Sequence, residues 1–139
     1  MATLTLALSV KQCRLEHLAS LVNEAATEQD PATLTFYAAP QPAAPEEALD
    51  GQIELAVVAV PVPFEADITN AVLTAAAFEE VLATGDGIAT WARLRDSAGT
   101  PIADLTVGME GEGANITITQ TQFYQGVIVD VESLTIAEA

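Results

Sequence analysis

Basic residues are scarce in this chain of 139 residues. It contains 4 Lys and Arg against 20 Asp and Glu, so its formal net charge at pH 7 is −16. Such a protein repels phosphate groups along most of its faces. The composition therefore excludes a nucleic-acid-binding domain, and we expect no nucleic-acid partner.

Cysteine and histidine occur once each, as Cys13 and His17. A single cysteine excludes a disulfide-stapled secreted domain. The two residues lie four positions apart and could share a metal ion, but a zinc site takes three or four protein ligands. We therefore expect Cys13 to be a small buried side chain and His17 to lie on the surface or half-buried, with no metal bound.

Catalytic and phosphate-binding motifs are missing as well. The chain has no G-x-S-x-G, no phosphate-binding glycine loop and no H-E-x-x-H. The carboxylates that could coordinate calcium follow no calcium-loop pattern, and we expect them to be solvated: Asp86, Glu110, Glu112, Asp130 and Glu132. The sequence predicts no catalytic residue, no cofactor and no metal site, and we expect a protein that is not an enzyme.

Long hydrophobic runs are absent, although half of the residues are hydrophobic and the mean hydropathy is +0.34. The longest dense run, Ile53–Phe64, is too short to cross about 30 Å of hydrocarbon, so we expect no membrane association. No Lys or Arg precedes the apolar stretch Met1–Val10, so a signal peptide is not predicted. The hydrophobicity then indicates a large core or an apolar surface that a partner covers.

One amphipathic helix is predicted, over Ser9–Thr27. Ser9 and Gln12 have the spacing of a capping box, and Pro31 cannot continue a helix. The apolar residues that recur at roughly helical spacing are Val10, Cys13, Leu18, Leu21, Val22 and Ala25. We expect the helix to pack on one face of the domain or to project to a neighbour.

After Pro31, runs rich in Val, Ile and Thr alternate with Gly, Pro and Asp, which is typical of an all-β domain. The predicted strands are Leu34–Ala38, Gln52–Val60, Thr69–Thr74, Glu79–Ala83, Ile88–Arg95, Ile102–Val107, Asn115–Thr119 and Val127–Ile136. The stretch Ala71–Val81 is predicted to be strand, bend and strand. We expect one mainly β domain over residues 1–139, an antiparallel two-sheet sandwich or jelly roll of about eight strands with one N-terminal helix.

The most informative strand contains the only tryptophan. Because side chains alternate along a strand, Trp91, Arg93 and Arg95 share one face. Two interpretations stay open: an exposed sheet face where Trp91 packs under the arginine stems and the charges meet Asp96 or Asp104, or an anchor stripe at a protein interface. A hairpin turn is predicted at residues 96–99. Phe123 and Tyr124 are expected to pack at the end of the sandwich or to stack on a ligand.

The segment Thr90–Gly108 resembles a string common in small virion proteins of tailed bacteriophages. The matching residues are Thr90, Trp91, Arg93, Leu94, Asp96, Gly99, Thr100, Asp104, Val107 and Gly108, whereas Ala92 and Arg95 depart from it. Leu34–Pro42 also resembles that family, with Ala39 in place of a glycine. The helix and the terminal strand Val131–Ile136 match in position.

Length, β content and acidity are similar to those of capsid cement or decoration proteins, such as the jelly-roll cement protein of short-tailed Bordetella phages. The resemblance implies a structural protein on the outside of a capsid shell, made in the host bacterial cytoplasm. Its implied partners are a major capsid protein of HK97-like fold and further copies of itself, as a homodimer or homotrimer. It implies no catalytic residue.

Two alternatives remain open: a tail or head–tail associated virion protein, and a carbohydrate- or calcium-binding β-sandwich module. Against the latter, only 5% of the residues are aromatic. The candidate interface residues are Trp91, Arg93 and Arg95 in the stripe, Pro40, Pro42 and Pro45 in a predicted extended loop, and Leu4 and Leu6 near the N-terminus.

Overall fold

The computed structural model describes residues 5–24, 26–27, 29–49 and 51–137. Their elements are α1 (Leu8–Asn23), β1 (Thr33–Tyr37), β2 (Glu54–Ala59), β3 (Glu65–Thr69), β4 (Val72–Ala75), β5 (Val81–Leu82), β6 (Gly87–Ile88), β7 (Trp91–Arg95), β8 (Pro101–Gly108), β9 (Ile116–Ile118), β10 (Gln122–Phe123), β11 (Ile128–Val129) and β12 (Val131–Ala137). The predicted fold class, mainly β with one N-terminal helix, is confirmed.

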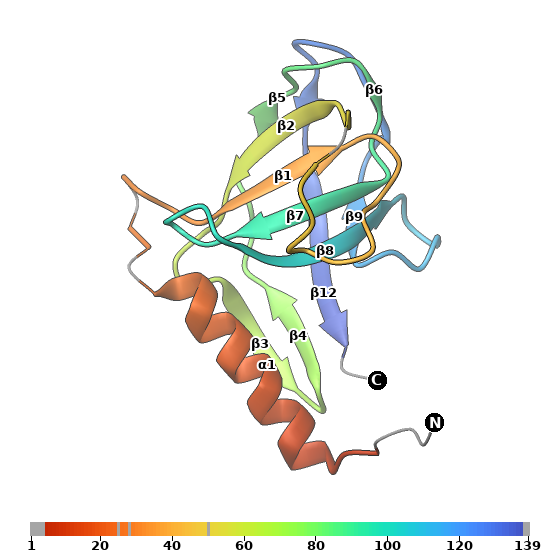
Figure 1. Ribbon diagram of the computed structural model, residues 1–139. Helices are drawn as coiled ribbons and strands as arrows, with labels where there is room; N and C mark the ends of the chain where they lie inside the picture. Colours follow the sequence, from red (N-terminus) through yellow and green to blue (C-terminus); the bar gives the residue numbers. More distant parts are fainter. Residues whose placement is uncertain (1–4, 25, 28, 50, 138–139) are drawn as a thin grey trace.

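Eight of the strands form one curled sheet in the order β2-β1-β7-β8-β9-β12-β4-β3. Figure 1 shows β12 passing behind β1 and β7, so that the sheet turns back over its own inner face. The space between is filled by a single hydrophobic core, represented by Leu34, Phe36, Leu94, Ile116 and Leu134. Two short ladders, β10–β6 and β11–β5, lie outside this sheet.

The prediction of a wholly antiparallel sheet is wrong at one pair. Strands β8 and β9 run parallel, with Val107 opposite Ile116 and Gly108 opposite Thr117. The side chain of Asn115 secures this junction: its carbonyl oxygen accepts hydrogen bonds from the backbone and hydroxyl of Thr106, and its amide donates to the carbonyl of Thr135 on β12. The Asn115 side chain thus links β8 and β12 at the start of β9.

Three predicted strands are interrupted. Thr69–Thr74 contains the tight turn between β3 and β4, where Asn70 and Ala71 have φ of 53° and 58°. Tight hairpin turns of this kind usually contain glycine, which makes them recognisable in a sequence, but this turn has none. The predicted strand Ile88–Arg95 breaks between β6 and β7, and Val127–Ile136 breaks at Asp130. The short strand β10 was not predicted. The prediction of strand, bend and strand over Ala71–Val81 is confirmed, because β4 ends at Ala75 and β5 begins at Val81.

The hairpin turn at residues 96–99 is confirmed. One carboxylate oxygen of Asp96 accepts hydrogen bonds from the backbone N–H groups of Ala98 and Thr100, at 3.0 and 2.9 Å. Gly99 adopts the positive φ of 87° that the turn needs. The turn therefore sets the register of β7 against β8.

Helix α1 differs from the prediction at both ends. It covers Leu8–Asn23, its N-cap is Ala7, and no side chain caps it, so the predicted capping box is wrong. The Gln12 side chain instead binds the β3–β4 hairpin: its amide donates to the carbonyl of Ile68, and its carbonyl accepts from the N–H of Ala71 at 2.9 Å. At the other end, Asn23 accepts from the N–H of Phe64 and donates to the Glu65 carboxylate.

The helix face that packs is narrower than predicted. Leu15, Ala19 and Val22 are buried, at spacings of four and three residues, and Leu18 packs beside them. Val10, Leu21 and Cys13 are exposed, so the expectation that Cys13 is buried is wrong. Figure 1 gives the reason: the helix lies along the β3–β4 hairpin at one side of the molecule, and no second element of the described residues lies over its outer face.

We predict that Gln12→Ala lowers the free energy of unfolding by about 1–3 kcal/mol, because two hydrogen-bonding groups of the β3–β4 turn lose their partner. Urea denaturation followed by circular dichroism measures the change. Gln120→Ala is the matched control, since Gln120 is exposed. Equal stability of the two variants would show that Gln12 does not fasten the helix.

Candidate functional site

The predicted stripe of Trp91, Arg93 and Arg95 lies on one face of β7, as the period of two requires. That face is not exposed. Trp91 is 0% exposed, Arg93 is 2% exposed and Arg95 is half-buried. Both interpretations, an exposed sheet face and an anchor stripe at an interface, are therefore wrong about the exposure of these side chains. Trp91 and Arg93 have no exposed surface that a partner could contact.

The aromatic residues of this face form a layer with the arginines. Tyr37 on β1 is opposite Trp91 on β7, and their rings stack with centroids 4.7 Å apart and planes at 21°. The guanidinium of Arg93 lies 5.3 Å from the Trp91 ring centroid, and that of Arg95 lies 5.9 Å from the Tyr37 ring centroid. At these distances each cation is attracted to the ring face.

Arg93 and Asp104 form a two-pronged ion pair across β7 and β8. The distances are 2.7 Å from Nε to Oδ1 and 3.0 Å from Nη2 to Oδ2, with the side chains 3% and 4% exposed. The hydrogen bond that Arg93 donates to Asp104 raises the pKa of Arg93 above its ordinary value by more than burial lowers it. The pairing of an arginine with Asp104 was foreseen from sequence; its burial was not.

The proline-rich loop between β1 and β2 covers this layer. Arg93 Nη1 donates to the carbonyl of Glu47 at 3.0 Å, and Trp91 Nε1 donates to the carbonyl of Ala38 at 3.0 Å. Figure 1 shows the loop crossing in front of β7 and β8. Two groups that were proposed separately as interfaces, the stripe and the loop, thus bind each other within one chain.

The other candidate residues lie in this loop and near the start of α1. Pro40 is exposed, whereas Pro42 and Pro45 are half-buried in the loop. Leu6 is half-buried just before α1, and Leu4 lies outside the described residues. His17 is exposed, as one of the predicted alternatives has it. Their part in any interface stays a prediction.

Sequence reasoning missed the exposed apolar side chains of the two short ladders and of the turn after β10. Strands β5 and β6 of these ladders lie at the top of Figure 1. Four large apolar side chains are 53–61% exposed in these segments: Leu82, Ile88, Tyr124 and Ile128. Leu82 and Ile128 are directly opposite each other in the β5–β11 pair, and the carbonyl of Tyr124 accepts a hydrogen bond from Val127 next to them. We call these four residues the end surface.

The charge around the end surface has one sign. Glu80, Asp86 and Asp130 border its strands along the chain, whereas all four basic residues of the protein lie on α1 and β7. Phe123, beside Tyr124, is buried against Phe36, so the predicted packing at the sandwich end holds for the phenylalanine alone. The end surface is therefore apolar with an acidic border.

A sequence signal for the end surface does exist. Adjacent apolar pairs occupy two-residue strands, Val81–Leu82 and Ile128–Val129. Since neighbours on a strand point to opposite faces, one member of each pair can enter the core only if the other faces outward. Val129 is buried and Ile128 is exposed, as this rule requires.

Other chemistry finds little support in the described part of the chain. No group of three or more His, Cys, Asp or Glu lies close enough to hold a metal ion there. Across the same residues, no helix is both long and apolar enough to span a membrane.

We predict that Asp104→Asn lowers the free energy of unfolding by about 3 kcal/mol, near the lower end for a broken buried pair because a single loop covers it. The double variant Arg93→Met/Asp104→Leu restores most of that loss, since it leaves no buried charge unpaired. Urea melts of the three proteins test this. A single variant as stable as the parent would contradict a buried ion pair.

Comparison with protein-family models, curated proteins and solved structures gave no match to this chain.

Proposed function

We propose that this chain is a structural protein of a tailed-bacteriophage virion, a capsid cement or decoration protein that binds the outside of the shell of major capsid protein and stabilises it by bridging capsomers. The end surface is the observation that supports this best. Each of its four apolar side chains is more than half exposed, on a protein with a net charge of −16. Large apolar side chains that stay exposed on so acidic a protein are typical of a protein-binding surface.

The energetics suit a cement. Burial of apolar area contributes roughly 25 cal/mol per Å² before the cost of association is subtracted. The loop over Trp91 and Arg93 is already held by hydrogen bonds, so docking orders little additional chain. Because a shell repeats its sites, a small net energy per copy is multiplied over the particle.

The acidic charge has a role in the same proposal. Free copies repel one another before assembly, and the protein avoids DNA. The end surface lacks basic residues, so the shell site that fits it is apolar with Lys or Arg at its border.

The resemblance to phage virion proteins supports the proposal at the level of architecture. Its strongest part, Thr90–Gly108, is the β7–β8 hairpin, and the matching residues Trp91, Arg93 and Asp104 are buried under the loop. These three residues hold the hairpin together and are not free to contact a capsid. The contact surface is therefore sought elsewhere in the chain.

Quantitative mass spectrometry of purified particles tests the role directly, by counting this chain against the major capsid protein. We expect a ratio near one or a simple fraction of it. A handful of copies per particle would instead favour the tail or the head–tail connection, and complete absence would contradict a virion role.

The end surface is tested by the double variant Leu82→Ala/Ile128→Ala. We predict a loss of about tenfold or more in affinity for shells, because anchor residues at interfaces typically contribute more than 1 kcal/mol each. The matched control is Leu8→Ala/Leu21→Ala on α1, where both leucines are also exposed. Cosedimentation with shells that lack the protein gives the readout. If the control loses binding and the first variant keeps it, the outer face of α1 is the contact.

A further inference from the structure

The two edges of the eight-stranded sheet are treated differently. Strand β3 forms one edge, and α1 covers it through Gln12 and Asn23. Strand β2 forms the other edge, and its sequence from Leu55 to Val60 contains no charged residue. Natural sheets usually protect an open edge with charge, but β2 carries charge only at its first residue, Glu54, and prolines follow only after the strand ends.

The register of β2 shows which backbone groups face outward. The N–H of Val60 donates to the carbonyl of Ala32, so Val60, Val58 and Ala56 direct their backbone groups toward β1. Val57 and Ala59 lie between them and direct their N–H and C=O groups away from the sheet. Leu55 confirms this direction, because its carbonyl accepts from Thr84 on the outer side.

This outer edge is open at Val57 and Ala59. Thr84 and Gly85 donate hydrogen bonds to this edge at Leu55, and β5 packs beside β2. No backbone group among the described residues bonds the outward groups of Val57 or Ala59. The Val57 side chain is 40% exposed, and Ala59 is exposed as well. Four backbone hydrogen-bonding groups are thus available in the geometry that an added strand uses.

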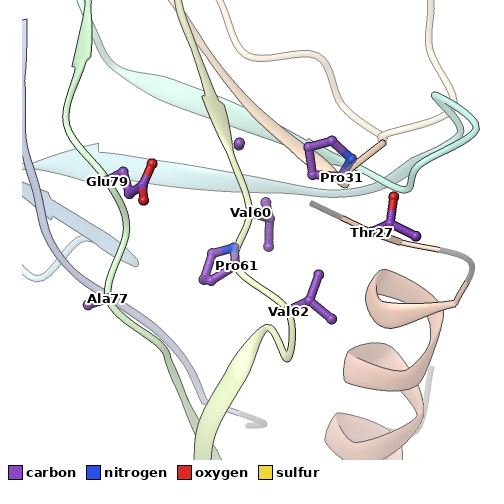
Figure 2. A pocket seen from close by; sticks show the side chains of 8 residues that line it. Thr27, Pro31, Val60, Pro61, Val62, Ala77 and Glu79 are labelled. Carbon is purple, nitrogen blue, oxygen red and sulfur yellow. The ribbon is translucent and has the colours of Figure 1, made fainter. Parts of the chain in front are cut away.

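A hollow of about 460 Å³ adjoins the open edge. Figure 2 shows Val60, Pro61 and Val62 through its middle, Ala77 and Glu79 on one side, and Thr27 and Pro31 on the other. Six of the eight lining residues are apolar, and Glu79 is the only charged one among them. The Glu79 side chain is exposed and has no ion pair or side-chain hydrogen bond in the described part of the chain.

We propose that the edge of β2 at Val57 and Ala59, with the hollow beside it, binds an extended peptide segment of a partner protein. The segment adds a strand to the sheet, places apolar side chains against Val60–Val62, and carries a Lys or Arg that pairs with Glu79. Backbone hydrogen bonds supply the affinity of such strand addition, and the side-chain pocket supplies its selectivity. This site does not rest on the virion role.

A second copy of this chain does not fit as the occupant. Its four basic residues are Lys11 and Arg14 on α1, Arg93 in the buried ion pair, and Arg95 hydrogen-bonded to Thr35 and Tyr37. None of them lies on an extended segment that could be offered to a neighbour. The occupant is therefore a different protein with a basic, strand-forming segment.

The experiment is an NMR titration of the labelled full chain with the peptide acetyl-TVTVKVTV-amide, up to about 1 mM, where millimolar affinity is still detectable. We expect saturable shifts at the amides of Val57, Ala59 and Glu79. A twin peptide N-methylated at alternate residues loses binding, because it cannot form the strand-edge hydrogen bonds. A twin with Glu in place of Lys binds more weakly.

Two protein variants locate the charge. Glu79→Gln lowers the affinity for the lysine peptide by about two- to fivefold, the range for an exposed ion pair. Its matched control, Glu80→Gln, leaves the affinity unchanged, because Glu80 is exposed and does not line the hollow.

Three outcomes would overturn the proposal. The first is the absence of shifts at Val57 and Ala59 at the highest peptide concentration. The second is equal binding of the lysine and glutamate peptides, which excludes a basic segment. The third is a shift of the same amides with protein concentration alone, which makes a second copy the occupant.

Discussion

The guanidinium of Arg93 joins the β7–β8 hairpin to the loop between β1 and β2, whose Glu47 lies 46 residues earlier in the chain. It forms a two-pronged ion pair with Asp104 on β8, lies over the ring of Trp91 on its own strand, and donates to the carbonyl of Glu47 in the loop. Removing its charge partner leaves a buried cation, which is far more costly than an exposed one. The loop, the hairpin and the stacked Tyr37 therefore depend on this one contact.

The consequence for binding is that the most interface-like residues of the sequence are unavailable. Trp and Arg are favoured anchors at interfaces, but here they stabilise the chain itself. Exposed apolar side chains are found instead on the end surface and along the open edge of β2. The first is an apolar area with an acidic border, suited to a folded surface; the second offers backbone groups, suited to an extended segment. The two surfaces thus differ in the shape of the partner they accept.

Helix α1 covers one edge of the sheet and buries only a narrow face of its own. Gln12 and Asn23 bind backbone groups of the β3–β4 hairpin at two points, and a narrow stripe of Leu15, Ala19 and Val22 lies between them. One edge of the sheet is covered in this way, while the opposite edge stays open. The asymmetry follows from the side-chain hydrogen bonds of Gln12 and Asn23, which hold α1 on the side of the β3–β4 hairpin.

The sequence alone determined the β-rich class, the single N-terminal helix, the 96–99 turn and the residues that share a face of β7, because composition, local hydrogen bonding and the period of two act between neighbours. It did not determine what covers each face. Trp91 is buried by a loop more than 40 residues earlier, and Val10 and Cys13 are exposed because no element lies over that side of α1. The Gln12 side chain does not cap the helix, because it hydrogen-bonds to a hairpin almost 60 residues away. Those outcomes depend on long-range contacts, which only the tertiary structure decided.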